Sequence, residues 1–210
     1  MSNFLQMVAM IDQYLINHGI DQNIKSTMHD VSVNKCDNTS NIVYVYNGKN
    51  NLDVLDMDAI AKNGYKVIKK PNDKPNNSAD AFLINNNNEW FFIEFKDAPI
   101  NESKISIIKK AYSNWYMLMD ILFEMRGSGE EYLQFDFDNP IKFAQYNVTY
   151  IVVCSNEKNP QIYMQIKNKD LIGETYTPPF LEKIKTYIFK DVYAYTEFYF
   201  EKKFANKFTY

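Results

Sequence analysis

Three charged residues near the middle of the chain, Asp80, Glu94 and Lys96, have side chains that could perform chemistry together. Glu94 and Lys96 are two residues apart in an apolar segment, and a β-strand would therefore direct both side chains to one face. Asp80 lies between two alanines in the preceding apolar segment. If the two segments pair, the carboxylates of Asp80 and Glu94 come close together, and with the lysine they are enough to hold a divalent metal and a water.

The elements that must position these residues form a predicted β-hairpin. Residues 78–84 and 89–96 are short apolar runs joined by four asparagines, which is typical of two antiparallel strands and a polar loop. Alternation in the second run directs Phe91, Ile93 and Phe95 to one face, and it directs Phe92 to the face that carries the two charges. Because charge is costly on a central strand, the position of Glu94 favours a function over an incidental ion pair. The alternative, an exposed cross-face ion pair between Glu94 and Lys96, would contribute little stability.

Helices and strands are predicted on both sides of the hairpin. Apolar residues at helical spacing predict an amphipathic helix over residues 2–17, with Ser2-Asn3 available as its cap. A short helix is expected over 52–61, ending near Gly64, and a strand over 65–70. After the hairpin we expect a long helix over 101–126 and a strand over 146–154 that is buried on both faces. The core-facing stripe predicted for the long helix is Ile105, Ile108, Ala111 or Tyr112, Trp115, Met119 and Leu122.

The C-terminal quarter gives weaker patterns. We expect a strand over 161–166, a helix over 180–189 and an aromatic edge strand or hairpin partner over 192–204. The aromatic side chains of this last segment could stack on bases, although packing at a sheet edge or dimer interface suits alternating aromatics better. Strands flanked by helices predict an α/β fold around a central mixed sheet.

Composition narrows the class of protein. At 210 residues with 46% hydrophobic residues, the chain suits one folded domain, 1–210. The net charge of −3 argues against a protein that coats nucleic acid, but not against an enzyme that contacts a few phosphates. Lysines 62, 66, 69, 70 and 74 fit a solvated face better than a DNA-binding track. Lys110 and Asn114, one helical turn apart, are either phosphate ligands or ordinary solvent-facing positions.

The cysteines and the hydropathy bear on the cellular setting. Cys36 and Cys154 are far apart and belong to no Cys-x-x-Cys pair, so neither a disulfide framework nor a thiolate zinc site is predicted. No run approaches the roughly 20 apolar residues that a spanning helix needs. We therefore expect a cytoplasmic protein without a membrane association.

The residues Asp80 and Glu94-Phe95-Lys96, set between flanking helices and followed by a long helix and a buried strand, resemble the PD-(D/E)xK nuclease superfamily. The resemblance covers residues 65–154 and implies a restriction-endonuclease-like core, with 155–210 as a C-terminal extension. Ala79 stands where the family has its nominal proline, and the helix has Lys110 and Asn114 where many relatives have glutamine and tyrosine. The motif is short, so the order of elements carries most of the resemblance.

The resemblance implies a magnesium- or manganese-dependent nuclease that cleaves phosphodiester bonds, with DNA as the expected partner, in a bacterial or phage defence or mobile-element setting. Asp80, Glu94 and the carbonyl of Phe95 would be the metal ligands, and Lys96 would orient or deprotonate the attacking water. Lys110 and Asn114 would contact phosphate. The alternative is a protein with this fold but without cleavage, such as an immunity or regulatory partner of a toxin. A homodimer or a protein partner is compatible with either function.

Overall fold

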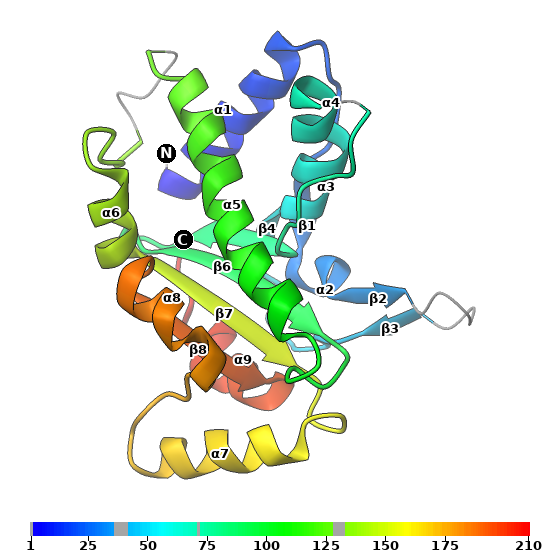
Figure 1. Ribbon diagram of the computed structural model, residues 1–210, viewed down its shortest axis with the longest axis vertical. Coiled ribbons are helices and arrows are strands. Elements are labelled where there is room, and N and C mark those ends of the chain that lie inside the picture. Colours follow the sequence, from blue (N-terminus) through cyan, green and yellow to red (C-terminus); the bar gives the residue numbers. More distant parts are fainter. Residues whose placement is uncertain (1, 36–41, 71, 128–132) are drawn as a thin grey trace.

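The computed structural model describes residues 2–35, 42–70, 72–127 and 133–210 (Figure 1). A six-stranded mixed sheet in the order β1-β4-β5-β6-β7-β8 runs through the molecule. Its strands are β1 (Lys25–Thr27), β4 (Asp53–Asp56), β5 (Ala81–Ile84), β6 (Trp90–Lys96), β7 (Val148–Cys154) and β8 (Asp191–Thr196). Pairing is antiparallel from β1 to β6, whereas β7 and β8 run parallel to β6. The predicted α/β class with a central mixed sheet is therefore confirmed.

Helices surround this sheet (Figure 1). They are α1 (Asn3–Asn17), α2 (Met28–Val31), α3 (Met57–Ala59), α4 (Lys66–Lys69), α5 (Lys104–Glu124), α6 (Pro140–Asn147), α7 (Pro160–Leu171), α8 (Glu182–Tyr187) and α9 (Glu197–Lys203). A π-helical segment, η1 (Ile60–Tyr65), joins α3 to α4, and two 3₁₀ turns are η3 (Pro179–Leu181) and η4 (Ala205–Lys207). In Figure 1, α5 crosses in front of the sheet and α9 lies behind it. A separate two-stranded sheet, β2 (Val33–Lys35) with β3 (Ile42–Tyr44), projects from the body.

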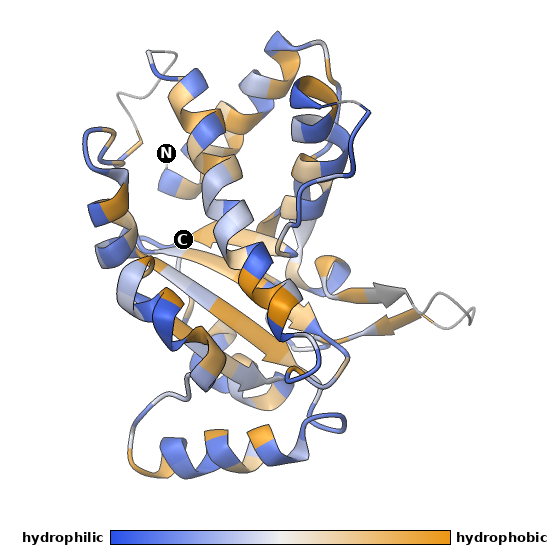
Figure 2. Ribbon diagram, viewed as in Figure 1, coloured by the Kyte–Doolittle hydropathy of each residue, from blue (hydrophilic) through white to orange (hydrophobic). Residues whose placement is uncertain are grey.

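The predicted hairpin and the doubly buried strand are both present. β5 pairs with β6 from Ala81 opposite Ile93 to Ile84 opposite Trp90, and every residue of β7 is buried. The hydropathy colouring in Figure 2 shows apolar strands, whereas the segment between α4 and β5 is hydrophilic. The central position of β6, between β5 and β7, explains why its residues up to Phe95 are buried.

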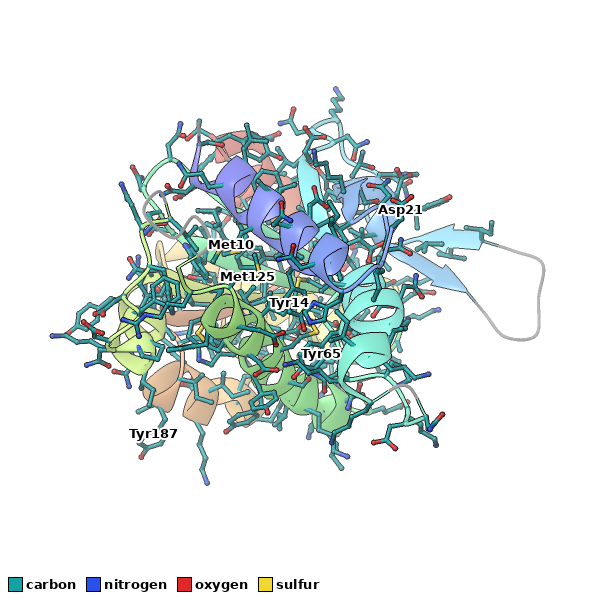
Figure 3. All side chains as sticks on the ribbon, turned by 90° about the horizontal axis from the view of Figure 1, so that it is seen from above. Met10, Tyr14, Asp21, Tyr65, Met125 and Tyr187 are labelled. Carbon is teal, nitrogen blue, oxygen red and sulfur yellow. The ribbon has the colours of Figure 1, made fainter. Side chains whose placement is uncertain are left out.

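The first helix forms as predicted, and it packs beside the end of α5. The Ser2 side chain caps α1 by accepting a hydrogen bond from the Leu5 amide. Figure 3 shows Met10 and Tyr14 of α1 near Met125, which follows α5, with Tyr65 alongside. Each of these side chains is buried. This contact layer closes the core above the sheet, because long apolar side chains on two helices interdigitate there.

The strand predicted over 65–70 is wrong, since these residues end η1 and form α4. Tyr65 is buried and Ile68 packs on the core, whereas Val67 is exposed, which is the spacing of a helix rather than of a strand. The helix predicted over 52–61 begins only at Met57. Residues 53–56 form β4, whose Val54 and Leu55 are both buried between neighbouring strands. β4 therefore takes the place of the expected strand that precedes β5.

The C-terminal predictions are partly correct. The strand expected over 161–166 is wrong, because Pro160 begins helix α7 and the buried Ile162 and Ile166 are four residues apart. The helix expected over 180–189 is present as η3 and α8. β8 is the expected edge strand as far as Thr196, but the prediction is wrong beyond it, because Glu197–Lys203 form helix α9. Residues 155–210 thus add a sixth strand to the same sheet.

The cysteines and the hydropathy of the helices were the basis of the predicted cellular setting. Cys154 is buried with a free thiol, and Cys36 lies outside the described residues. In the described part of the chain, no helix is both long and apolar enough to cross a membrane.

Candidate functional site

Asp80 and Glu94 lie side by side where β5 begins. Asp80 directly precedes the Ala81–Ile93 pair, and its backbone amide donates to the Ile93 carbonyl at 3.0 Å. The Phe95 amide donates to Asp80 Oδ2 at 2.6 Å, which fixes the carboxylate against β6. Glu94 is fully buried on this central strand. The two carboxylates are thus positioned by strand pairing, as the spacing predicted.

Two ammonium groups accompany the two carboxylates. Lys96 Nζ lies 2.5 Å from Glu94 Oε1, on the face predicted by alternation. Lys110 reaches in from α5, and its Nζ lies 2.8 Å from both carboxylate oxygens of Glu94 and 3.7 Å from Asp80 Oδ1. The side chains of Asp80, Lys96 and Lys110 each keep 17–18% of their surface exposed. The cluster is therefore buried at Glu94 and open to solvent at the other three groups.

The proximity of these charges changes their proton affinities. Burial, and then the charge of Glu94, raise the pKa of Asp80 from its ordinary value of 3.8 to about 8, although Lys110 and the Phe95 amide act in the opposite direction. Burial by itself would lower the pKa of Lys110, but Asp80 and Glu94 outweigh it and the pKa rises. Lys110 therefore stays charged at neutral pH, while Asp80 changes its protonation state within the physiological range.

The cluster opens into a pocket of about 270 Å³. Its wall includes Asp80, Phe95, Lys96 and Lys110 from the cluster, and Ser32 and Val45 from the chain beside β2 and β3. Asp80 and Lys96 thus meet at one solvent-accessible place, whereas Glu94 is buried behind the pocket wall and contacts Lys96 and Lys110. A pocket of this size next to two carboxylates can admit an ion, several waters and part of a ligand.

An acidic residue that the sequence prediction left without a role lies on the other side of Asp80. Asp58 and Asp80 both line a second pocket, of about 340 Å³. Asp58 accepts a hydrogen bond from the Ser78 hydroxyl and pairs with Lys62, and its charge contributes to the raised pKa of Asp80. No sequence signal indicated this position, because residues 52–61 were predicted as a helix, whereas residues 53–56 form β4 next to β5 and bring Asp58 near the start of β5.

Lys110 and Asn114, the pair expected to contact phosphate, have different environments. Lys110 lines the pocket, whereas Asn114 is fully buried. The Asn114 Nδ2 donates to the Lys110 carbonyl at 2.5 Å, and its Oδ1 has no hydrogen-bond partner among the described residues. Only Lys110 is thus placed where a ligand in the pocket can reach it.

The core-facing stripe predicted for α5 is largely confirmed. Of the alternatives at 111 and 112, Ala111 is buried, and Ile108, Trp115 and Met119 pack on the core, whereas Ile105 is 70% exposed and its assignment is wrong. The buried residues of the helix are Ile107, Ala111, Asn114, Met117, Leu118, Ile121 and Leu122. The inner face also carries Lys110 and Asn114, and hydrophobicity alone could not place these polar residues there.

The cluster offers a metal ion few protein ligands. Among the described residues, no group of three or more histidine, cysteine or acidic side chains is placed to hold a metal. Asp80 and Glu94 supply two carboxylates, and Mg²⁺ is commonly held by one or two carboxylates with water or phosphate oxygens in the remaining positions. Lys110 Nζ lies between the two carboxylates as a stand-in cation. Phe95 contacts Asp80 through its amide, and the role of its carbonyl stays a prediction.

Comparisons with protein-family models, with curated proteins and with solved structures find no match to this chain.

Proposed function

We propose that this protein is a metal-dependent nuclease of the PD-(D/E)xK type that hydrolyses phosphodiester bonds, with DNA as its substrate. The observation that carries the proposal is that Asp80 and Lys96 line one pocket, with the buried Glu94 in contact with Lys96 behind it. The order of elements supports it: three antiparallel strands, β4, β5 and β6, are followed by the long helix α5 and by β7 parallel to β6. A restriction-endonuclease-like core is the fold that this order favours.

In this proposal each side chain has a separate role. Asp80 and Glu94 hold Mg²⁺ or Mn²⁺, which neutralises charge on the phosphate and lowers the pKa of a bound water. Lys96 extends from the same face of β6 as Glu94 and orients a water or a phosphate oxygen in the pocket. Lys110 neutralises the carboxylates when no divalent ion is bound. When a divalent ion replaces its ammonium group beside Glu94, Lys110 can contact phosphate.

Metal binding is the first test, because it does not depend on knowing the substrate. Calorimetric titration of wild-type protein with Mg²⁺ and Mn²⁺ should show binding. Asp80→Asn and Glu94→Gln should each weaken it by roughly tenfold or more, because each removes one charged ligand. Asp138→Asn is a matched control, since Asp138 is 91% exposed and remote from the cluster. It should bind both ions as wild type does.

Cleavage is the second test. When labelled single-stranded and double-stranded DNA are each offered in Mg²⁺ or Mn²⁺, wild type should cut at least one of them. Asp80→Asn, Glu94→Gln and Lys96→Met should leave both intact, whereas Asp138→Asn should retain activity. Melting curves of each variant show whether it is folded. If the wild type binds neither ion and leaves both DNAs intact, the nuclease proposal is wrong.

A second candidate function is a binding protein that has this fold but does not cleave. The observation that favours it is that the buried carboxylate of Glu94 is already paired with two lysines, Lys96 and Lys110. Such a protein would need no metal. Its melting temperature would be the same in EDTA and in excess Mg²⁺, whereas a ligand that binds only the native state raises the melting temperature.

A further inference from the structure

A groove of about 260 Å³ lies between α4, the segment that follows it, and the outer side of α5. Its lining is basic and aromatic, and it includes Lys66, Lys69, Lys70, Lys74, Tyr65 and Tyr116. Asp73 is the one acidic residue in this lining. The groove thus concentrates positive charge in a chain whose net charge is −3, and such local fields attract oppositely charged ligands.

The lysines between positions 62 and 74 do not form one uniform solvated face. Lys62 pairs with Asp58 on the side of the second pocket, and Lys69 pairs with Asp120 and Glu124. Lys66, Lys70 and Lys74 make no ion pair with any residue in the part of the chain that the structure describes. Three ammonium groups in the groove are therefore available to a ligand.

Exposed aromatic rings accompany these lysines. Tyr116 lines the groove and is 66% exposed, and Tyr112, one helical turn earlier on the same face of α5, is 50% exposed. Exposed rings beside lysines are the combination that binds single-stranded nucleic acid, because rings stack on unpaired bases while ammonium groups contact the phosphates. The Tyr65 hydroxyl donates to Asp120, so this ring is held in the wall.

The groove leads toward the carboxylate cluster. Asn76 Nδ2 donates to the Ser113 carbonyl at 3.0 Å, and the Ser113 hydroxyl donates to the Asn77 carbonyl, which anchors the segment against α5. Asn77 and Asp80 are three residues apart, a span of at most about 10 Å. On α5, Lys109 is exposed and the adjacent Lys110 enters the cluster. One strand of nucleic acid can therefore contact both places.

We propose that this groove binds a single-stranded polynucleotide through Lys66, Lys70 and Lys74 and through stacking on Tyr116 and Tyr112, and that it directs the strand toward Asp80. This inference rests on the proposed nuclease function, and it names the substrate as unpaired rather than duplex nucleic acid. Duplex bases are stacked on each other and leave the exposed tyrosines without a partner.

The test is binding without metal. In EDTA, fluorescence anisotropy with labelled oligothymidine, oligouridine and a DNA duplex should show that either single strand binds more tightly than the duplex. Comparison of the affinities for oligothymidine and oligouridine shows whether the groove prefers DNA or RNA. The triple variant Lys66→Gln/Lys70→Gln/Lys74→Gln should lower single-strand affinity at least tenfold and reduce the salt slope by about 2, since each lost phosphate contact removes roughly 0.7.

A matched control changes charge equally elsewhere. Lys142→Gln/Lys167→Gln/Lys183→Gln alters three exposed lysines outside the groove and should leave single-strand affinity within about twofold of wild type. Tyr116→Ala should weaken single-strand binding by about fivefold or more, with an unchanged salt slope, because base stacking is lost and no charge is removed. Melting curves should match wild type for all three variants.

The outcomes separate this inference from the proposed function. Equal losses in the two triple variants, or duplex binding as tight as single-strand binding, overturn the groove assignment. If cleavage depends on Asp80 but the groove variants bind and cut normally, the nuclease proposal stands and the groove proposal is wrong. If the groove variants lose binding but no cleavage is found, the groove proposal stands without the nuclease.

Discussion

Lys110 places its ammonium nitrogen 2.8 Å from each carboxylate oxygen of Glu94, a residue without solvent exposure. A buried carboxylate is costly unless it is paired, so this contact contributes to the stability of the central strand. The same ammonium lines the pocket. In the proposed nuclease it occupies the place of the divalent ion, so under that proposal stability and metal binding compete for one position.

Replacement of Lys110 by methionine should separate these two effects. Lys110→Met keeps the length of the side chain but leaves Glu94 with Lys96 alone, and it should lower the free energy of unfolding at pH 7 by about 3 kcal/mol. Mg²⁺ should restore more stability to the variant than it adds to wild type, since no ammonium competes for the carboxylates. Urea denaturation with and without Mg²⁺ measures both quantities.

Lys109→Met is the control for this prediction. Lys109 is the preceding residue of α5 and is exposed, so its loss should change the free energy of unfolding by no more than about 0.5 kcal/mol. Equal destabilisation by the two variants would show that the Lys110–Glu94 contact contributes no more to stability than an exposed lysine does.

The raised pKa of Asp80 makes stability depend on pH. Because the pKa is about 8 in the folded protein and 3.8 ordinarily, the folded chain keeps a proton that the unfolded chain loses as pH rises above about 4. The stabilisation from this bound proton is complete below about pH 4 and is lost by about pH 8. Between these values the free energy of unfolding falls by up to about 1.4 kcal/mol per pH unit. Asp80→Asn, which keeps an acceptor for the Phe95 amide, should therefore gain stability over wild type as pH rises.

Urea denaturation at pH 5 and at pH 8 measures this effect. At each pH, the free energy of unfolding of wild type is compared with that of Asp80→Asn. Groups that titrate equally in both proteins cancel in that difference. A difference that stays constant between pH 5 and pH 8 would mean that Asp80 has an ordinary pKa. Asp138→Asn serves as the control, because that side chain is almost fully exposed and its substitution should give the same small difference at both pH values.

Strand periodicity made the core of the site predictable. Alternation along residues 90–96 determines that Glu94 and Lys96 share a face, and pairing with the preceding segment determines that Asp80 lies beside Glu94. These relationships depend on local spacing, which a sequence contains. Asp58 and Lys110 come from other elements, and their arrival at the site depends on how those elements dock.

The polar residues on the inner face of α5 were the feature that the sequence left undetermined. The predicted stripe began at Ile105, which is exposed, and it omitted Asn114, which is polar and buried. A pattern search penalises a buried asparagine, so it could not assign Asn114 to the core. The energetic cost of that asparagine is a property of the packed structure and leads to a further prediction.

Asn114→Leu should stabilise the protein. The Asn114 Oδ1 is buried without a partner among the described residues, and an unsatisfied buried polar atom costs about 1–3 kcal/mol. Leucine has a similar size and removes this cost, so the free energy of unfolding should rise by about 1 kcal/mol. Asn114→Asp, which buries a charge instead, should destabilise. If Asn114→Leu is instead destabilised and loses metal-dependent cleavage, the asparagine has a functional partner in the site.

Gly64 was expected to end a helix, yet the chain stays helical through it to Lys69. The reason for glycine is close packing, because a Cβ at this position would lie 2.6 Å from Leu15 Cδ2 of α1. Leu15 is 1% exposed, so it has no solvent to move into. Gly64→Ala should therefore lower the free energy of unfolding by about 1–2 kcal/mol despite the better helix propensity of alanine.

A double-mutant cycle tests whether that cost is the contact with Leu15. Leu15→Ala alone leaves a cavity and should cost about 3 kcal/mol. In the double variant, the new methyl group fits into the space that the leucine vacated, so the combined loss should be smaller than the sum of the two single losses by at least about 1 kcal/mol. Asn63→Ala, at an exposed neighbouring position, should show no such coupling with Leu15→Ala. Additive losses for Gly64 and Leu15 would mean that the glycine is required for another reason.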